Sequence, residues 1–286
     1  MWYNKENCKG GLFTDILRES SFEELYTRYA VDDDPDDRNF VMHVHESCEI
    51  FYFVSGNAEY LVEGARYPLE SGSILIMRPA ESHRAKILGG GKYERYAVNF
   101  SVSAIDNIDP EHRLLKAFFD RPIGRGNLFL PTKFGGEDVR KIFAEMCRKS
   151  SSYETQLNIN THLFWLLDRI NRAWLKRGTA DYAPPQNISE RIVLYVNYHL
   201  FEELSVPMLA EHFYLSPSQF SRIFKQATGA APWEYITIKR LTAAREKIRS
   251  GEAVQYAAES CGFDDYSTFY RAYVKYFGRS PKYDNM

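Results

Sequence analysis

The chain has 286 residues, of which 44% are hydrophobic and 15% aromatic, so it can bury a sizeable core and is long enough for about two domains. Its formal net charge of −2 conceals a basic region, since residues 216–249 hold seven Lys and Arg against two Glu. Charged residues interrupt every apolar stretch before the ~20 residues needed to cross a membrane, and the N-terminus lacks the apolar core of a secretory signal. We therefore expect no membrane contact and a cytoplasmic location.

Residues 40–100 contain short runs rich in Val, Ile, Phe and Tyr, separated by glycine turns roughly every ten residues. The runs are EIFYFVSG, AEYLVEG, SGSILIMRP and RYAVNFSV. Such spacing is typical of an antiparallel sandwich or barrel. We predict a β-rich domain over residues 1–105.

The segment HVHESCEI, residues 43–50, resembles part of a metal site. If it is a β-strand, His43, His45 and Glu49 occupy alternate positions and share one face. Two imidazoles and a carboxylate are ligands for zinc, iron, copper or nickel, and His83 would complete a set of four. The alternative is that the same side chains hydrogen-bond a small hydroxylated ligand in the mouth of a barrel.

Further residues could take part in binding such a ligand. Arg95 and Asn99 lie on another predicted strand at matching parity. Aromatic rings that could stack on a sugar face are those of Trp2, Tyr52 and Tyr60, although a single aromatic residue in a sheet is more often part of the core.

After residue 110 the apolar residues recur with the period of a helix. One stripe is Val139, Ile142, Phe143 and Met146, and a second is Ile159, Leu163, Leu166, Ile170, Ala173 and Trp174. We predict a helical dimerisation segment over 106–178 that forms a homodimer, its second stripe packing on the first helix and on a partner chain. The sequence KRGTADYAPPQN then has the composition of a linker, assigned to 179–187, before a helical domain at 188–286.

The last domain contains an internal repeat. AEHFYL at 210–215 is echoed by AESCGF at 258–263, and the pattern F-x-R-x-F-x4-G from Phe220 recurs from Phe269 with Tyr in place of the second Phe. Each copy predicts a helix, a tight turn and a second helix. In the first copy, Ser216 and Gln219 form an expected capping box at the start of the second helix.

The second helix of each copy presents a polar and basic face opposite its apolar one. These faces consist of Ser218, Ser221, Arg222 and Lys225 in the first copy, and of Tyr266, Ser267, Tyr270 and Arg271 in the second. Such a face suits a helix in the major groove of double-stranded DNA. A merely solvated face is the alternative for one helix alone, and the duplication argues against it.

Between the copies, PWEYITIKRLTAAREKIRSG predicts a helix of about 18 residues, ~27 Å long. A spacer of that length could hold two recognition helices near the ~34 Å separation of successive major grooves. Lys239 and Arg240 on this helix are candidate phosphate contacts.

These segments resemble the DNA-binding domain of AraC-type transcription regulators over about 100 residues, including the G-F and F-G-x-S-P signatures. The resemblance implies two helix-turn-helix units joined by a long helix, a sequence-specific regulator and, if it activates, contact with RNA polymerase. Val274 and Asp284 replace residues that are commonly basic in that family, which implies modest backbone affinity from the second unit.

Residues 43–84 are similar to the cupin sensor domain of such regulators, with H-x-H-x3-E-x6-G followed by Gly72, Pro79 and His83. The glycine that usually precedes the first motif is absent, and PAE replaces P-x-G in the second. The expected fold is thus a multidomain α and β chain: a cupin-like β-barrel with a helical segment, then an all-α double helix-turn-helix domain.

The resemblance implies a sensor without enzymatic activity or a required cofactor. Its effector is expected to be a sugar or related polar metabolite, bound by His43, His45, Glu49, His83, Arg95 and Asn99. A metal-dependent cupin enzyme or a metal sensor, using His43, His45, Glu49 and His83 as ligands, is the alternative.

Overall fold

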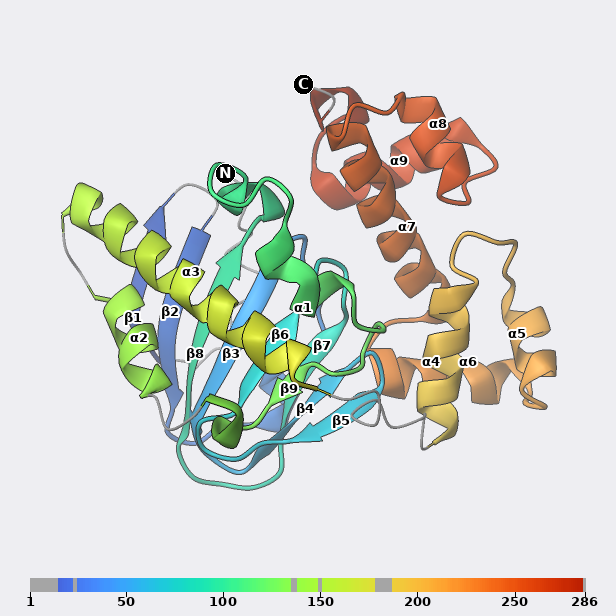
Figure 1. The fold of residues 1–286 in the computed structure, drawn as a ribbon. Helices are drawn as coiled ribbons and strands as arrows, with labels where there is room; N and C mark the ends of the chain where they lie inside the picture. Colours follow the sequence, from blue (N-terminus) through green and yellow to red (C-terminus); the bar gives the residue numbers. More distant parts are fainter. Residues whose placement is uncertain (1–14, 23–24, 135–137, 149–150, 178–186, 285–286) are drawn as a thin grey trace. The chain divides into compact units, whose positions relative to one another are not determined.

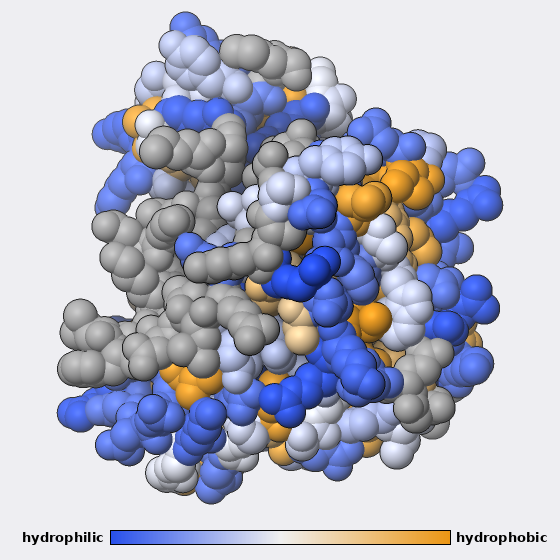
Figure 2. Space-filling model, turned by 90° about the vertical axis from the view of Figure 1, so that its left-hand side faces the viewer, coloured by the Kyte–Doolittle hydropathy of each residue, from blue (hydrophilic) through white to orange (hydrophobic). Residues whose placement is uncertain are grey.

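The computed structural model describes residues 15–22, 25–134, 138–148, 151–177 and 187–284 (Figure 1). The chain divides into two compact units, Met1–Pro184 and Pro185–Met286. Within the described ranges, no helix has the length and apolarity needed to span a membrane. On the face drawn in Figure 2, hydrophobic residues form small separate patches among hydrophilic ones.

The first unit is built on two antiparallel sheets. One has the strand order β1-β2-β8-β3-β6-β9 and the other β5-β4-β7. The strands are β1 (Asp15–Phe22), β2 (Leu25–Asp32), β3 (Cys48–Ser55), β4 (Ala58–Val62), β5 (Ala65–Pro68), β6 (Ile74–Met77), β7 (His83–Ile87), β8 (Tyr93–Phe100) and β9 (Leu128–Phe129). The four runs predicted as strands are confirmed as β3, β4, β6 and β8.

The two sheets pack face to face around an apolar core that includes Phe51, Tyr60, Val62, Leu75 and Ala85. In the described residues these strands form two separate sheets, so the predicted barrel is an open sandwich rather than a closed cylinder. A single antiparallel bridge between His43 and His83 joins the segment before β3 to β7, the edge strand of the smaller sheet.

Helices cover the outer face of the larger sheet, as Figure 1 shows for α3. They are α1 (Lys116–Phe119), α2 (Val139–Met146) and α3 (Ser152–Leu175), with short 3₁₀ turns at Asp37–Asn39, Val102–Ile105, Arg113–Leu115 and Pro131–Phe134. A capping box between Ser151 and Glu154 begins α3. Both predicted helices are thereby confirmed.

The apolar stripe of α3 was predicted to serve a partner chain as well, and that part of the prediction is wrong. Ile159, Leu163, Leu166 and Ile170 are all buried in one core with the outer face of the sheet. The sheet face itself is apolar, through residues such as Val98, so the stripe is covered within the chain.

The second unit is helical throughout its described residues. Its helices are α4 (Ile188–Tyr198), α5 (Val206–His212), α6 (Pro217–Thr228), α7 (Pro232–Arg249), α8 (Val254–Ser260) and α9 (Tyr266–Phe277), followed by a 3₁₀ turn at Pro281–Asp284. The capping box of Ser216 and Gln219 is present, and Gly229 ends α6 in the left-handed conformation. The predicted repeat is thus two helix-turn-helix units, α5–α6 and α8–α9.

Helix α7 is shared by the two helix-turn-helix units. Tyr235 and Ile236, near its start, belong to the core of the first helix-turn-helix unit, whereas Leu241 and Ile248 belong to the core of the second. An 18-residue helix is ~27 Å long, as predicted.

The turns of the two helix-turn-helix units each contain one left-handed residue, at equivalent positions of the repeat. In the first turn it is Tyr214, with φ of 56°, and in the second Gly262, with φ of 82°. Tyr214 is 97% exposed, whereas a β-carbon at Gly262 would lie 2.9 Å from both the Phe201 carbonyl and the Arg240 guanidinium carbon. The first turn therefore has room for a side chain at its left-handed residue. The second turn has none, so it requires glycine both for space and for the left-handed conformation.

Candidate functional site

Four of the predicted ligand residues converge at one end of the sandwich. His43, His45, Glu49 and His83 each offer a ligand atom, and these atoms all lie within 4.8 Å of one another. The His45 Nε2 is 2.9 Å from a Glu49 carboxylate oxygen, and the His83 Nε2 is 3.6 Å from the same oxygen. Backbone hydrogen bonds of 3.0 and 3.1 Å tie His43 to His83.

The local backbone achieves this convergence differently from the prediction. Strand β3 begins at Cys48, and the chain bends at Glu46 and Ser47. In a continuous strand His45 and Glu49 would be ~13 Å apart along the chain, at ~3.3 Å per residue. The prediction of one strand face is therefore wrong for His43 and His45, although the residues still meet.

Each histidine is held by its second ring nitrogen. The Nδ1 atoms of His43, His45 and His83 lie 3.1, 2.9 and 2.7 Å from the backbone oxygens of Val41, Ser47 and Glu81. A carbonyl only accepts, so each Nδ1 carries the proton and donates it. Each ring thereby directs its Nε2 atom toward the cluster, the orientation that metal-bound histidines have.

Glu49 supplies the negative charge of the cluster. Although burial opposes its ionisation, the hydrogen bond to His45 and the nearby His83 ring hold the pKa of Glu49 well below its usual range. The Asn99 amide donates to the same carboxylate at 2.9 Å. Burial, together with the neighbouring His83 and His45, lowers the pKa of His43 to about 3, so this ring is neutral at physiological pH.

These residues fit a divalent transition-metal ion. The imidazole Nε2 atoms and the carboxylate match the ligands of zinc, iron or nickel, and the buried His83 Nε2 has no hydrogen-bond partner among the described residues. An ion bound by His43, His45, Glu49 and His83 would supply a Lewis-acidic centre that attracts the oxygen atoms of an effector.

The other predicted effector residues are distributed around the cluster. Asn99 and Tyr60 belong to it: the Tyr60 ring stacks on His83 with 6.1 Å between ring centres. Arg95 is buried in the sandwich but forms an ion pair with Asp32 and packs on the Tyr93 ring, so its guanidinium is already engaged.

One of the aromatic residues considered for sugar stacking, Tyr52, lies away from the site. Tyr52 packs against Phe143 of α2, on the opposite face of the sheet from Glu49, so the prediction that it lines the site is wrong. Its position in β3 differs in parity from that of Glu49, which explains the opposite orientation. Trp2 lies outside the described residues.

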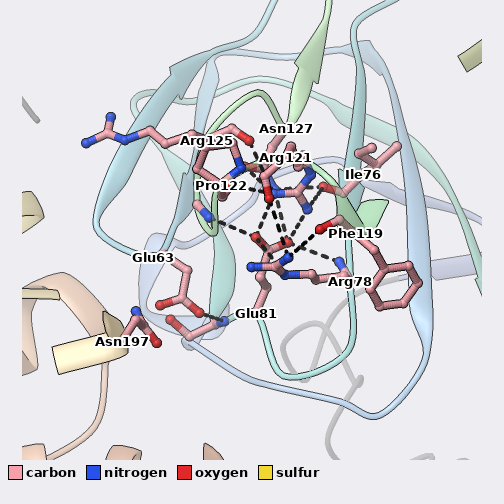
Figure 3. A network of polar contacts seen from close by, with 12 residues as sticks. Glu63, Ile76, Arg78, Glu81, Phe119, Arg121, Pro122, Arg125, Asn127 and Asn197 are labelled. Atoms are coloured by element: carbon pink, nitrogen blue, oxygen red, sulfur yellow. Dashed lines mark hydrogen bonds and ion pairs between the residues drawn. The ribbon is translucent and has the colours of Figure 1, made fainter. Parts of the chain in front are cut away.

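Sequence reasoning missed a buried polar network next to the cluster (Figure 3). The Glu81 carboxylate forms a two-point ion pair with Arg121 and accepts hydrogen bonds from the Gly124 backbone nitrogen at 2.8 Å and the Asn127 amide at 3.2 Å. The available signal was the acidic residue in PAE, two positions before His83.

In the second unit the predicted DNA-facing residues lie at the surface. Ser218, Arg222 and Lys225 on α6 are exposed and Ser221 is partly so, while Phe220 and Phe224 are fully buried. On α9 the exposed residues are Tyr266, Ser267, Tyr270 and Arg271, opposite the buried Phe269 and Tyr273. The two helices thus repeat one arrangement of an apolar inner face and a polar outer face.

The structure contradicts the phosphate contacts expected of Lys239 and Arg240, because both are buried, at 3% and 5% exposure. The Lys239 ammonium lies 5.1 Å from the centre of the Tyr235 ring. The Arg240 guanidinium donates to the carbonyls of Leu200 and Glu202, at 2.8 and 2.6 Å, and to that of Gly262 at 2.5 Å. Arg240 therefore connects the segment after α4 to the turn of the second helix-turn-helix unit, α8–α9.

Asp284 also has internal partners, and its expected effect on DNA affinity stays a prediction. It is buried and accepts a hydrogen bond from Tyr273 at 2.8 Å, and it pairs with Arg245 at 3.1 Å and with Arg279. Although burial opposes ionisation, the hydrogen bonds from Arg279 and Tyr273 lower the pKa of Asp284. Asp284 thus fixes the C-terminal turn to α7 and α9.

Comparison with known proteins agrees with this division. The model of the AraC-like ligand-binding domain matches residues 26–167, and that of a helix-turn-helix domain matches residues 209–283. The uncharacterized HTH-type transcriptional regulator YobQ of Bacillus subtilis is 34% identical over 246 residues, covering 86% of this chain and 88% of YobQ.

Two further similar proteins have lower sequence identity. The HTH-type transcriptional activator RhaS of Escherichia fergusonii is 24% identical, over 85% of this chain and 86% of RhaS. Among solved structures, ToxT from Vibrio cholerae aligns over 91% of this chain and 98% of ToxT, with 12% identity and a TM-score of 0.41. With a ligand-binding domain before a helix-turn-helix domain, and a relative such as YobQ, the chain belongs to the AraC family of transcription regulators.

Proposed function

We propose that the chain binds two adjacent major grooves of a specific double-stranded DNA site through α6 and α9, under the control of a small effector bound in the sandwich. The observation that carries the proposal is the repeated outer face, with Arg222 and Arg271 at equivalent positions. Helix α7 connects the two units across ~27 Å, close to the ~34 Å between successive major grooves. This role belongs in the cytoplasm and involves no catalysis.

Substitution of Arg222 tests the DNA proposal. If Arg222 contacts a base edge, Arg222→Ala should weaken binding to the chain's own upstream DNA by ~1–3 kcal/mol and relax preference at one base pair. Arg191→Ala, which removes an exposed arginine of α4, is the matched control and should leave the affinity unchanged. Equal losses by Arg222→Ala on specific and random DNA, in titrations at fixed salt, would contradict the assignment.

We propose that the effector is a sugar or related polar metabolite that binds at His43, His45, Glu49, His83 and Asn99. Hydroxyl groups suit this site because they both donate and accept hydrogen bonds, and the site offers imidazole nitrogens, a carboxylate and an amide. Arg95 has a supporting role through Asp32 and does not contact the ligand directly. A thermal-shift screen of sugars should identify a ligand that raises the unfolding temperature.

A second candidate is control by a metal ion, favoured by the three Nδ1-anchored imidazoles. His45→Gln separates the candidates, because glutamine still forms hydrogen bonds but is a poor metal ligand. Sugar control predicts modestly weaker effector binding, with basal DNA binding intact. Metal control predicts near-stoichiometric zinc, iron or nickel in the wild-type protein and its loss from His45→Gln, measured by elemental analysis.

We also propose a homodimer, with the outward face of α3 as the contact in place of its buried stripe. Tyr153, Leu157 and Leu175 are exposed and lie along one side of this helix, at separations of four and eighteen residues. A dimer would bind paired DNA half-sites with higher effective affinity. If the chain activates transcription, RNA polymerase is a further partner.

A further inference from the structure

We infer that the Glu81–Arg121 network is a positioning device that connects the effector cluster to Arg177, at the end of the first unit. The inference rests on the proposed control of DNA binding by the cluster. It assigns Glu81, Arg121 and Arg177 a role in transmitting a change, without contact to the effector or to DNA.

The first connection is between His83 and the turn that precedes β7. The His83 Nδ1 donates to the Glu81 carbonyl oxygen at 2.7 Å, so the position of residue 81 sets the direction of the imidazole. The His83 backbone also exchanges two hydrogen bonds with His43. A displacement of this turn therefore moves two of the four residues of the cluster together.

The second connection is between that turn and residues 121–127. The Glu81 carboxylate is completely buried, as is Arg121, and its two oxygens bind the two terminal nitrogens of Arg121 (Figure 3). The Gly124 nitrogen and the Asn127 amide donate to the same carboxylate. Gly124, with φ of 66°, has no room for a side chain, because a β-carbon would lie 2.5 Å from that of Glu63.

The third connection is between this loop and the last described residue of the first unit. The Arg177 guanidinium donates to the Gly126 carbonyl at 2.6 Å and to the Leu128 carbonyl, and it lies 3.7 Å from the centre of the Phe129 ring. Arg177 follows α3 by two residues, and the chain continues through 178–186 to α4 of the DNA-binding unit.

These contacts make a continuous series from the cluster to the point where the chain leaves the first unit. The side chains in this series are packed or charge-paired rather than solvated. A shift of the cluster therefore requires the contacts around Arg177 to change as well. Binding couplings are reciprocal, so a change at Arg177 should be detectable at the cluster even without an effector.

The experiment uses the full chain with Arg177→Ala, and with Arg177→Lys as a milder variant that retains the charge but loses the two-carbonyl contact. The control is Arg172→Ala, which removes an exposed arginine of α3 that pairs only locally with Asp168. Amide hydrogen exchange is measured in peptides that contain His43 and His83. We expect both Arg177 variants to raise exchange there at least about fivefold, the low end of allosteric couplings.

Exchange that rises only between Gly126 and Phe129, with His43 and His83 unchanged, would overturn the inference. Exchange in α9 should stay at the wild-type rate, which distinguishes transmission from general unfolding. The same result with Arg172→Ala as with Arg177→Ala would also overturn it.

A DNA-binding cycle then separates this inference from the proposed function. His45→Gln is combined with Arg177→Ala, and DNA affinity is measured with the sugar from the thermal-shift screen present below saturation. Under that condition the effect of His45→Gln on DNA affinity should largely disappear in the double variant. If His45→Gln has the same effect in both backgrounds, the route through Arg177 is wrong. If it has no effect even in the wild type, control by the cluster fails, whereas the exchange data still decide whether Arg177 is coupled to it.

Discussion

Arg240 provides the sharpest test of how the DNA-binding unit is held together. Its buried guanidinium donates to the carbonyls of Leu200, Glu202 and Gly262, which belong to two different parts of the unit. Replacement by alanine leaves the buried Leu200 carbonyl and two partly buried carbonyls without their donor, and a fully buried group left unpaired costs ~1–3 kcal/mol. Relief from burying the guanidinium charge offsets part of this loss. We expect a net loss of about 3 kcal/mol in the free energy of unfolding.

The assay is chemical denaturation of the full chain, with the loss of helix in the second unit followed by circular dichroism. Arg240→Lys should recover only part of the stability, because a single ammonium group cannot reach three separated carbonyls. Arg222→Ala is the matched control: this residue is exposed, so its unfolding should change by no more than ~0.5 kcal/mol.

A structural role of Arg240 and a phosphate contact by Arg240 lead to opposite results in stability and in DNA affinity. An Arg240→Ala protein that unfolds at the wild-type denaturant concentration, yet binds specific and random DNA equally more weakly, would restore Arg240 as a phosphate contact. We expect Arg240→Ala to lower the free energy of unfolding and to leave the DNA affinity of the folded protein unchanged.

Two further predictions concern the first unit. The first tests the proposed homodimer: Leu157→Glu should shift it toward monomer in light scattering, whereas Ile108→Glu, at an exposed apolar residue outside α3, should not. A dimer unchanged by Leu157→Glu would exclude this face of α3. The second prediction concerns Glu81. Burial opposes its ionisation, but Arg121 lowers its pKa from 4.5 to about 2, so between pH 2 and pH 4.5 the unfolded state binds more protons than the folded state. The shift contributes about 3 kcal/mol to the free energy of unfolding above pH 4.5, and this contribution is lost as the pH falls toward 2. Glu81→Gln should remove this pH dependence from acid-unfolding curves.

The elements with a regular hydrophobic period could be predicted from the sequence. The alternation in β3 and β8 and the stripes of α2 and α3 mark one buried face each, and the capping residues of α6 define its start locally. Strands β1 and β2 were not predicted. The four-residue cluster was also predictable as a set, because its residue types limit the chemistry.

Features that depend on contacts distant in sequence could not be predicted in this way. Helix α7 packs into two cores, so its buried residues occur around much of its circumference and a basic residue such as Arg240 gives no sign of facing inward. Arg121 pairs with Glu81 across 40 residues, for which the local pattern contains no signal. The bend at Glu46 and Ser47 likewise depends on where the second sheet meets the segment before β3.

The two helix-turn-helix turns have a consequence for protein engineering. Position 214 accepts tyrosine in an exposed left-handed turn, but position 262 faces the guanidinium of Arg240 and the Phe201 carbonyl. Exchange of the turn sequences is therefore asymmetric: the second can be grafted into the first without a clash, whereas tyrosine at 262 would displace the buried arginine. A chimera built from two copies of the first turn would therefore have to move both the Arg240 side chain and the backbone at Phe201.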